Sequence, residues 1–153
     1  MSDIHIYIDG DACPVRGECY KVAERHNVPV SVVSNSFLRV PKHPLFKAVI
    51  VSDGFDAADD YIAERASQTS VVITSDILLA ERCLKNDAFV IKPNGTLFTK
   101  DNIGGALAMR AIMTDLRDGA EQPNFGGPPP FSARDRSEFL QSLHTVLEKM
   151  KRG

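Results

Sequence analysis

Residues 56–83, which read DAADDYIAERASQTSVVITSDILLAERC, decide the fold class. The first part has a small or apolar residue at every fourth position, which predicts a helix over 57–67 with one inward face. The run at 71–74 is short and β-branched, so it predicts a buried strand. Asp76 then suits the start of a second helix over about 77–86. A helix, a strand and another helix in succession indicate an α/β protein.

Similar apolar runs flank this segment and predict the rest of a sheet. They alternate with helical segments, the first of which begins near Pro14. Because alternating strands and helices form parallel crossovers, we expect a mainly parallel, doubly wound sheet of about five strands with helices on both faces. The stretch 34–47 has no clear period and is expected to be a loop or an irregular helix. The predicted strands lie at 4–8, 30–33, 48–51, 71–74 and 88–91, with a hairpin strand at 96–99.

The C-terminal third is expected to be helical on both sides of a Gly- and Pro-rich loop. An apolar stripe runs from Leu107 to Leu116, and Ser132 suits the start of a final helix. The apolar face of that helix packs either on the domain or against a partner, and the sequence alone does not decide between them. The division that we adopt is an α/β domain at 1–118, a loop at 119–131 and a helix at 132–153 packed on the same domain.

Composition narrows the class of protein. A length of 153 residues fits one domain. The net charge of -2 means that a nucleic-acid partner must be held by a local basic patch. Three cysteines without a CxxC pair do not suit a disulfide framework or a structural zinc site, and they favour a reducing cytoplasm. No signal peptide or membrane span is expected, so the predicted location is cytoplasmic and no membrane partner is expected.

Aspartates follow several of the predicted strands. Asp9 and Asp11 come after the first strand, Asp53 comes after the third, and Asp76 comes after the fourth. Because the carboxyl ends of parallel strands meet at one edge of a sheet, these like charges should converge there and require a cation. Oxygen-only ligands suit Mg²⁺ or Mn²⁺. The predicted metal ligands are Asp9, Asp11, Asp56, Asp59, Asp60 and Asp76.

Helix capping is the alternative explanation for these aspartates. Asp is favoured at helix starts by the free N–H groups and by the helix dipole. Capping explains any single residue, and it is the preferred explanation for Asp53 or Asp56 taken alone. Capping is a weaker explanation for the presence of aspartate after three different strands.

The segments GFDAADDYIAERA at 54–66 and VVITSDILLAERC at 71–83 resemble the acidic helix and following strand of the PIN-like and 5′-nuclease (flap-nuclease-like) superfamily. In that superfamily an Asp after the first strand, an acidic helix start and an Asp after a later strand bind one or two metal ions. The matching positions here are Asp9, Asp59 or Asp60, and Asp76.

The whole chain more closely resembles the YaiI/YqxD family, bacterial proteins of unassigned function that are related to PIN domains. The resemblance is nearly end to end, and it implies a PIN-like fold and metal-dependent nuclease chemistry. It is carried by IDGDACP at 8–14, SNSFLRVP at 34–41, GFDAAD at 54–59, VITSDILLA at 72–80, KPNG at 92–95, GGP at 126–128 and RDR at 134–136.

The resemblance implies a specific mechanism. A metal held by Asp9 and Asp76, with Asp60 or Asp59, would polarise a phosphodiester and activate a water for in-line attack. A second metal would use Asp11, although Leu78 stands where two-metal members often carry another acid. The expected catalytic residues are therefore Asp9, Asp11, Asp60 and Asp76.

One segment could hold a nucleic acid. Residues 37–47 carry a charge of +3 from Arg39, Lys42 and Lys47 with no acid among them, which suits a phosphate backbone. A solvated loop explains any one of these residues equally well. The predicted nucleic-acid contacts, to RNA or another single strand, are Asn35, Ser36, Arg39, Lys42 and Lys47.

Two other functions compete with a nuclease. Asp9-Gly10-Asp11 resembles the nucleophile and acid pair of haloacid-dehalogenase-like phosphohydrolases, but the pair Asp59-Asp60 falls on a helix rather than at a later strand end. A non-catalytic module that binds metal or nucleic acid is the second alternative. The four histidines show no metal-ligand spacing, and no role is predicted for them.

Overall fold

The computed structural model describes residues 3–152 except 11–12, 53, 55 and 120–130. Within that part of the chain, six strands form one sheet in the order β3-β2-β1-β4-β5-β6. The first five strands are parallel, and β6 returns antiparallel to β5. The strands are β1 (His5–Asp9), β2 (Val30–Ser34), β3 (Phe46–Ile50), β4 (Ser70–Ile73), β5 (Phe89–Ile91) and β6 (Leu97–Phe98).

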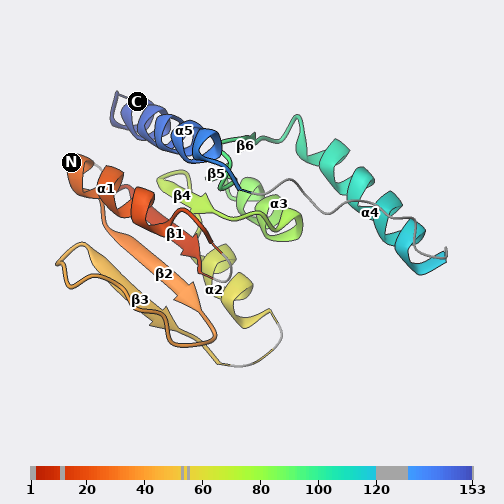
Figure 1. Ribbon diagram of the computed structural model, residues 1–153, viewed down its shortest axis with the longest axis horizontal. Helices are drawn as coiled ribbons and strands as arrows, with labels where there is room; N and C mark the ends of the chain where they lie inside the picture. The colour runs from red at the N-terminus through yellow and green to blue at the C-terminus, as the bar shows by residue number, and fades with distance from the viewer. Residues whose placement is uncertain (1–2, 11–12, 53, 55, 120–130, 153) are drawn as a thin grey trace.

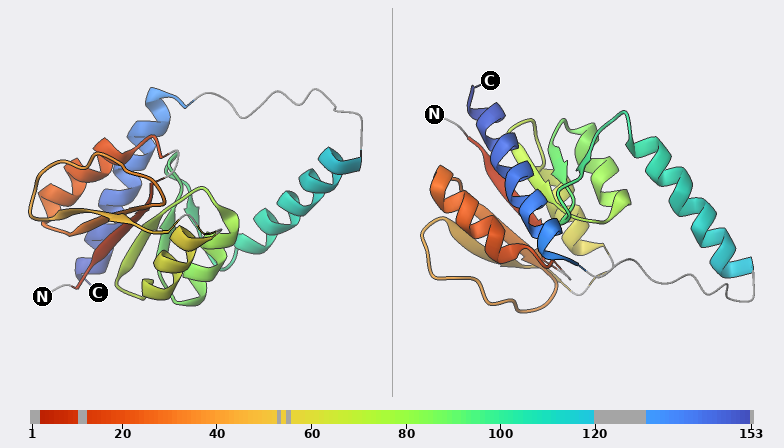
Figure 2. Two further views of the ribbon diagram at one scale, coloured as in Figure 1. Left: turned by 90° about the horizontal axis from the view of Figure 1, so that it is seen from below. Right: turned by 45° about the horizontal axis from the view of Figure 1, so that its top comes forward.

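Helices cover both faces of this sheet (Figure 1). One face carries α1 and α5, and the opposite face carries α2 and α3. The fourth helix, α4, extends away from the sheet (Figure 2) and exposes Met109, Ile112 and Leu116. The helices are α1 (Arg16–His26), α2 (Ala57–Arg65), α3 (Ile77–Lys85), α4 (Ile103–Gly119) and α5 (Ala133–Arg152).

The alternating side chains of β1 separate two apolar layers. Ile6 and Ile8 are fully buried against α1 and α5, whereas Tyr7 faces the layer under α2 and α3. Asp9, two residues after Tyr7, points to the same side of the sheet as Tyr7. The N-terminal strand therefore supplies both halves of the core and one acidic side chain at its carboxyl end.

The prediction of a mainly parallel sheet with a C-terminal helix is confirmed. The sheet has six strands instead of about five, because the short hairpin strand β6 joins it. The segment between β2 and β3 contains no helix, and β3 begins two residues before the predicted 48–51. As an edge strand, β3 leaves Lys47 and Ala48 exposed. In the described residues, no helix is long and apolar enough to cross a membrane.

The last helix begins where the sequence predicts and packs on the sheet. Ser132 and Asp135 cap it reciprocally: the Asp135 N–H donates to Ser132 Oγ at 3.1 Å, and the Ser132 N–H donates to Asp135 Oδ2 at 2.9 Å. The buried face of α5, which includes Phe139 and Leu143, joins the apolar layer of α1 and the sheet. The structure thus shows that the apolar face of this helix packs on the domain itself. The predicted loop at 119–131 lies almost entirely outside the described residues.

Gly95 makes the contact between the β5–β6 turn and α5. Its φ is +91°, and an added Cβ would lie 2.6 Å from the carbonyl carbon of Glu138. Ser142 Oγ also donates a 2.6 Å hydrogen bond to the Gly95 carbonyl. We expect Gly95→Ala to lower the free energy of unfolding by about 2 kcal/mol or more, because both the backbone strain and the clash oppose a side chain here.

Urea unfolding measures this effect, and Gly17→Ala is the matched control. Gly17 lies in α1 with no atom within 4 Å of an added Cβ, so that variant should be as stable as the natural protein or slightly more stable. Equal stabilities for the two variants would contradict the contact between the turn and α5.

Candidate functional site

The candidate site lies where the strand order reverses. From β1 the chain moves outward through β2 to β3, and it then crosses back to form β4 on the other side of β1. In open α/β sheets, such a switch point opens a crevice at the carboxyl ends of the strands. Asp9 is the last residue of β1, and Thr74 directly follows β4.

Thr74 joins the two strand ends. Its hydroxyl donates a 2.9 Å hydrogen bond to Oδ2 of Asp9, and Thr74 Oγ1 accepts a 3.0 Å bond from the backbone N–H of Asp76. Thr74 is buried, so the Asp9 carboxylate is held at a defined place beside the start of α3. The sequence reasoning did not single out Thr74, although its place in the Thr-Ser-Asp run after a strand was a usable signal.

Asp76 caps α3, as the alternative explanation predicts. Its Oδ1 accepts hydrogen bonds from the backbone N–H groups of Leu78 at 2.9 Å and Leu79 at 3.3 Å. Both bonds reach the same carboxylate oxygen. A carboxylate has a second oxygen with acceptor capacity of its own, so capping and metal binding are compatible at this residue.

Asp59 brings further negative charge to the same place. It lies half-buried in the first turn of α2. Burial, followed by the charges of Asp76, Asp9 and Asp56, raises the pKa of the Asp59 carboxyl to about 6, while Arg82 acts in the opposite direction. Four carboxyl groups from two strand ends and one helix start therefore influence one another here.

Asp60 does not share this environment. Its exposed carboxylate accepts a 2.9 Å hydrogen bond from Nη1 of Arg82. Consecutive residues of an α-helix point about 100° apart, so Asp59 and Asp60 cannot both face the strand ends. Of the two positions that the sequence left open, the structure brings Asp59 rather than Asp60 beside Asp9 and Asp76, and the catalytic role of Asp60 stays a prediction.

Of the remaining acidic candidates, the structure describes Asp56 but not Asp11 or Asp53. Asp56 precedes α2 with φ 65° and makes no capping bond with its side chain, so capping does not explain it. The charge of Asp56 is one of the causes that raise the pKa of Asp59. Asp11 and Asp53 lie outside the described residues, so the predicted second-metal ligand Asp11 has no described position.

The pKa of Asp59 predicts an unusual pH dependence of stability without metal. The unfolded carboxyl has its ordinary pKa of 3.8, and the folded one loses its proton only near pH 6. As pH rises between these values, the unfolded state gains its charge first, so the folded state loses relative stability and the full loss persists above pH 6. Asp59→Asn should therefore stabilise the metal-free protein at pH 7.5 by about 1 kcal/mol, after allowance for solvent screening.

Urea unfolding in a chelating buffer at pH 4 and pH 7.5 tests this prediction. The stabilisation by Asp59→Asn should shrink toward pH 4, where the natural carboxyl is protonated in the folded state. Asp60→Asn is the neighbouring control, which breaks the Arg82 ion pair and should not stabilise the protein at either pH. Identical pH profiles for the two variants would contradict the crowding of charge around Asp59.

A cationic hollow adjoins the acidic residues. Its volume is about 610 Å³, and Cys13, Arg16 and Arg39 are among its lining residues. Burial raises the pKa of the Cys13 thiol to about 11, and the charge of Asp9 acts in the same direction, which places Asp9 near this hollow. Two arginines thus line a hollow that lies near Asp9. Arg16 was not predicted from the sequence, because it stands outside the basic segment.

The other predicted nucleic-acid residues separate into two groups. Asn35 and Ser36 are exposed directly after β2, two and three residues beyond Val33, which pairs with Asp9. Lys42 is exposed in the segment that leads to β3. Lys47 lies within β3; burial, followed by the charge of Lys47, lowers the pKa of His5 at the start of β1. By register Lys47 lies level with Tyr7, two residues from the level of Asp9 toward the amino ends of the strands.

Comparison with known proteins identifies relatives along the full length of the chain. Residues 7–149 match the sequence profile of a family described as "Uncharacterized BCR, YaiI/YqxD family". A "UPF0178 protein" of Sphingopyxis alaskensis is 59% identical over 153 residues, 100% of this chain and 99% of the relative. One of Nitrobacter winogradskyi is 53% identical over 153 residues, covering 100% and 96% of the two chains. No solved structure matches the chain.

Proposed function

The chain belongs to the uncharacterised YaiI/YqxD family, and from this premise we propose that it is a metal-dependent nuclease that hydrolyses phosphodiester bonds in RNA or another single-stranded nucleic acid. One observation carries the proposal. At the switch point of the sheet, Thr74 couples Asp9 to the start of α3, and the Asp59 carboxyl lies among the neighbouring carboxylates. The PIN-like relationship suggested by the sequence is part of the same proposal.

The chemistry of the donor set suits Mg²⁺ or Mn²⁺. Asp9, Asp59 and Asp76 offer oxygen atoms only, as these hard cations prefer. In the described part of the chain, three aspartate oxygens do not come within 4.8 Å of one another. That spacing fits a cation that keeps several of its waters and takes few carboxylates directly, as Mg²⁺ usually does.

The protein's own residues would do three things in this reaction. Asp9 and Asp76 would hold the ion, with Asp59 as the third carboxylate, and Thr74 would keep Asp9 in place. When bound, the ion would supply a water of lowered pKa and a positive charge on the phosphodiester. Arg16 and Arg39, which line the neighbouring hollow, would bind the phosphates of the substrate, which the carboxylates alone would repel.

Cleavage of end-labelled single-stranded RNA and DNA, with Mn²⁺ or Mg²⁺ and with a chelator, tests the proposal on the unmodified protein. Cleavage that requires the metal is the expected result. Absence of both cleavage and Mn²⁺ binding would overturn it. Phosphate release from a small phosphoester, with nucleic acids left intact, would instead indicate the phosphohydrolase chemistry.

Arg39 is expected to contribute to binding of the nucleic acid. Arg39→Ala should weaken the binding of single-stranded RNA and lower the slope of log K against log salt by about 0.7, since one phosphate contact is lost. Lys47→Ala is the matched control from the same basic segment, because Lys47 lies in β3 near His5. Fluorescence anisotropy over a range of salt concentrations measures both variants, and an equal loss in both would contradict the assignment.

A further inference from the structure

A second group of side chains of metal-ligand type lies between α1 and α5, away from the aspartates at the strand ends. His26 is the last residue of α1, and His144 belongs to α5. His26 Nε2 lies 2.8 Å from His144 Nδ1. Glu148 Oε1 lies 3.8 Å from His26 Nδ1. Since α1 connects two parallel strands, its last residue lies at the amino edge of the sheet, opposite the acidic site.

We propose that His26, His144 and Glu148 form a zinc site that clamps α5 to α1. One ligand atom from each of the three lies within 4.8 Å of the other two. Ligand atoms around a tetrahedral Zn²⁺ are about 3.3 Å apart, given bond lengths near 2.05 Å. The three ligand atoms would therefore draw together from separations of up to 4.8 Å when an ion binds. Two imidazoles with one carboxylate are a ligand set that Zn²⁺ accepts, with a fourth position left open.

The fold explains why these residues meet. His144 and Glu148 are four residues apart on α5, so they share one face of the helix. Leu147, three residues after His144, lies at the margin of that face and is buried in the layer shared with α1. His26 is buried at the end of α1 and faces the same line of side chains. The sequence hides the pair, because 118 residues separate the two histidines.

Lys151 reveals the state of the His26 ring. Its ammonium donates to His26 Nδ1 at 3.0 Å and to the His26 carbonyl at 3.1 Å. Since an ammonium only donates, Nδ1 carries no proton, and Nε2 carries the proton that is directed at His144 Nδ1. Zn²⁺ bound between the two rings would take the place of that proton, which would move to Nδ1 and displace Lys151.

The surroundings keep the His26 ring neutral. Burial, followed by Lys151 and His144, lowers the pKa of His26, and Arg25 acts in the same direction while Glu148 acts in the opposite one. A neutral imidazole can bind a metal without first losing a proton to solvent. The Lys151 ammonium is thus the main competitor for the site, because it occupies Nδ1 and repels a cation.

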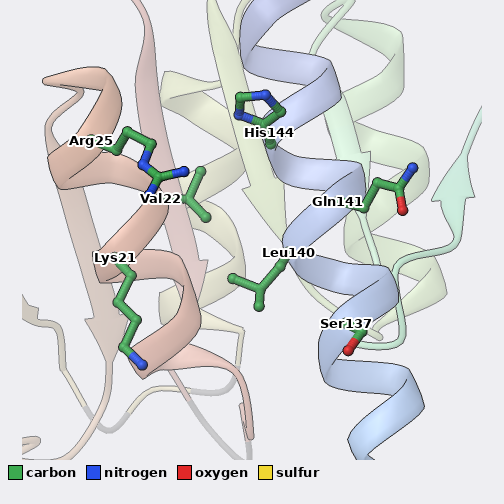
Figure 3. A pocket seen from close by; sticks show the side chains of 7 residues that line it. All are labelled: Lys21, Val22, Arg25, Ser137, Leu140, Gln141 and His144. Carbon is green, nitrogen blue, oxygen red and sulfur yellow. The ribbon is translucent and has the colours of Figure 1, made fainter.

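The open coordination position has space beside it. His144 helps to line a hollow of about 470 Å³ between α1 and α5, together with Lys21 and Arg25 (Figure 3). In Figure 3 the His144 ring lies on the side of α5 that faces α1. No acidic side chain lines this hollow. Water or a small anion such as phosphate or a carboxylate would complete the zinc coordination from that side.

Calorimetric titration of the full chain with Zn²⁺ alone tests the proposal. One ion should bind at this site, and His144→Ala or Glu148→Gln should weaken it by tenfold or more, since even outer-shell losses cost about 10–100-fold. Lys151→Met should strengthen binding. His43→Ala is the control, because His43 and Glu24 also lie 3.8 Å apart but only as a pair on the surface. Each variant is also made in an Asp9→Asn background, which keeps this site separate from the acidic one.

Two further measurements make the outcome decisive. Zn²⁺ should raise the melting temperature of the natural protein but not that of His144→Ala, since the ion joins two helices. Nitrogen NMR of the imidazoles should show the His26 proton moving from Nε2 to Nδ1. No Zn²⁺ binding by the natural protein, or binding that survives unchanged in both His144→Ala and Glu148→Gln, would overturn the proposal.

Discussion

Asp9→Asn is expected to lower metal-dependent cleavage of single-stranded RNA by about a hundredfold or more, with little change in fold. Asp9 ends β1 at the switch point, and the Thr74 hydroxyl holds its carboxylate there. An asparagine keeps the shape and still accepts the Thr74 bond, but it removes the negative charge that holds a cation. Loss of one charge-stabilising group from an active site typically costs about 10²–10³ in rate. Single-turnover cleavage with Mn²⁺ measures the change.

Three companion variants separate metal binding from simple structural roles. Asp76→Asn should lose activity like Asp9→Asn while keeping its stability, because asparagine caps a helix about as well as aspartate. Thr74→Val should lose about 10–100-fold, the usual cost of a group that only orients a ligand. Asp60→Asn should retain nearly full activity, since Asp60 pairs with Arg82 outside the cluster. Full activity of Asp9→Asn, or a large loss in Asp60→Asn, would contradict the site.

Phe139→Ala is expected to cause the largest loss of stability, about 3–5 kcal/mol in the free energy of unfolding. The side chain is fully buried, and it packs in the layer that α5 shares with α1 and the sheet. Removal of so large a group from a close-packed core costs the transfer energy of the ring and leaves a cavity. Urea unfolding and a lowered melting temperature would show the effect.

Phe37→Ala provides the matched control, because that phenylalanine is 79% exposed. Its loss should change the stability by less than about 0.5 kcal/mol, as for most surface substitutions. If the two variants had similar small effects, α5 would not contribute to the core of the domain. The comparison therefore tests the packing of the last helix without shortening the chain.

The strands could be predicted because their signals are local. Ile6 and Ile8 alternate along β1 with Ile4 just before it, and the β-branched run at 71–74 overlaps β4. Each predicted segment overlaps its strand to within one residue, because the pattern depends only on the period of a pleated strand and on the burial of its neighbours. The edge strand β3 was placed less well, since an edge strand is half exposed and its sequence FKAVI carries a weaker pattern.

The candidate site was predicted only in part. Asp9 and Asp76 follow strands, so the parallel sheet alone brings them to one edge. The choice between Asp59 and Asp60 depends on the rotation of α2 about its axis. Two adjacent aspartates in the sequence do not indicate which of them faces the strand ends. Lys47 shares a basic segment with Arg39, yet the register of β3 sets it beside His5 instead.

By itself, the sequence determined the alternation of helices and strands, the parallel sheet, the family, and the gathering of aspartates at the carboxyl ends of the strands. These follow from periodicity, from the residues next to each strand and from long matching segments. Only the tertiary structure decided that Thr74 joins Asp9 to Asp76 and that His26 meets His144. Such contacts depend on strand order and helix rotation, which arise from packing between segments 65 to 118 residues apart.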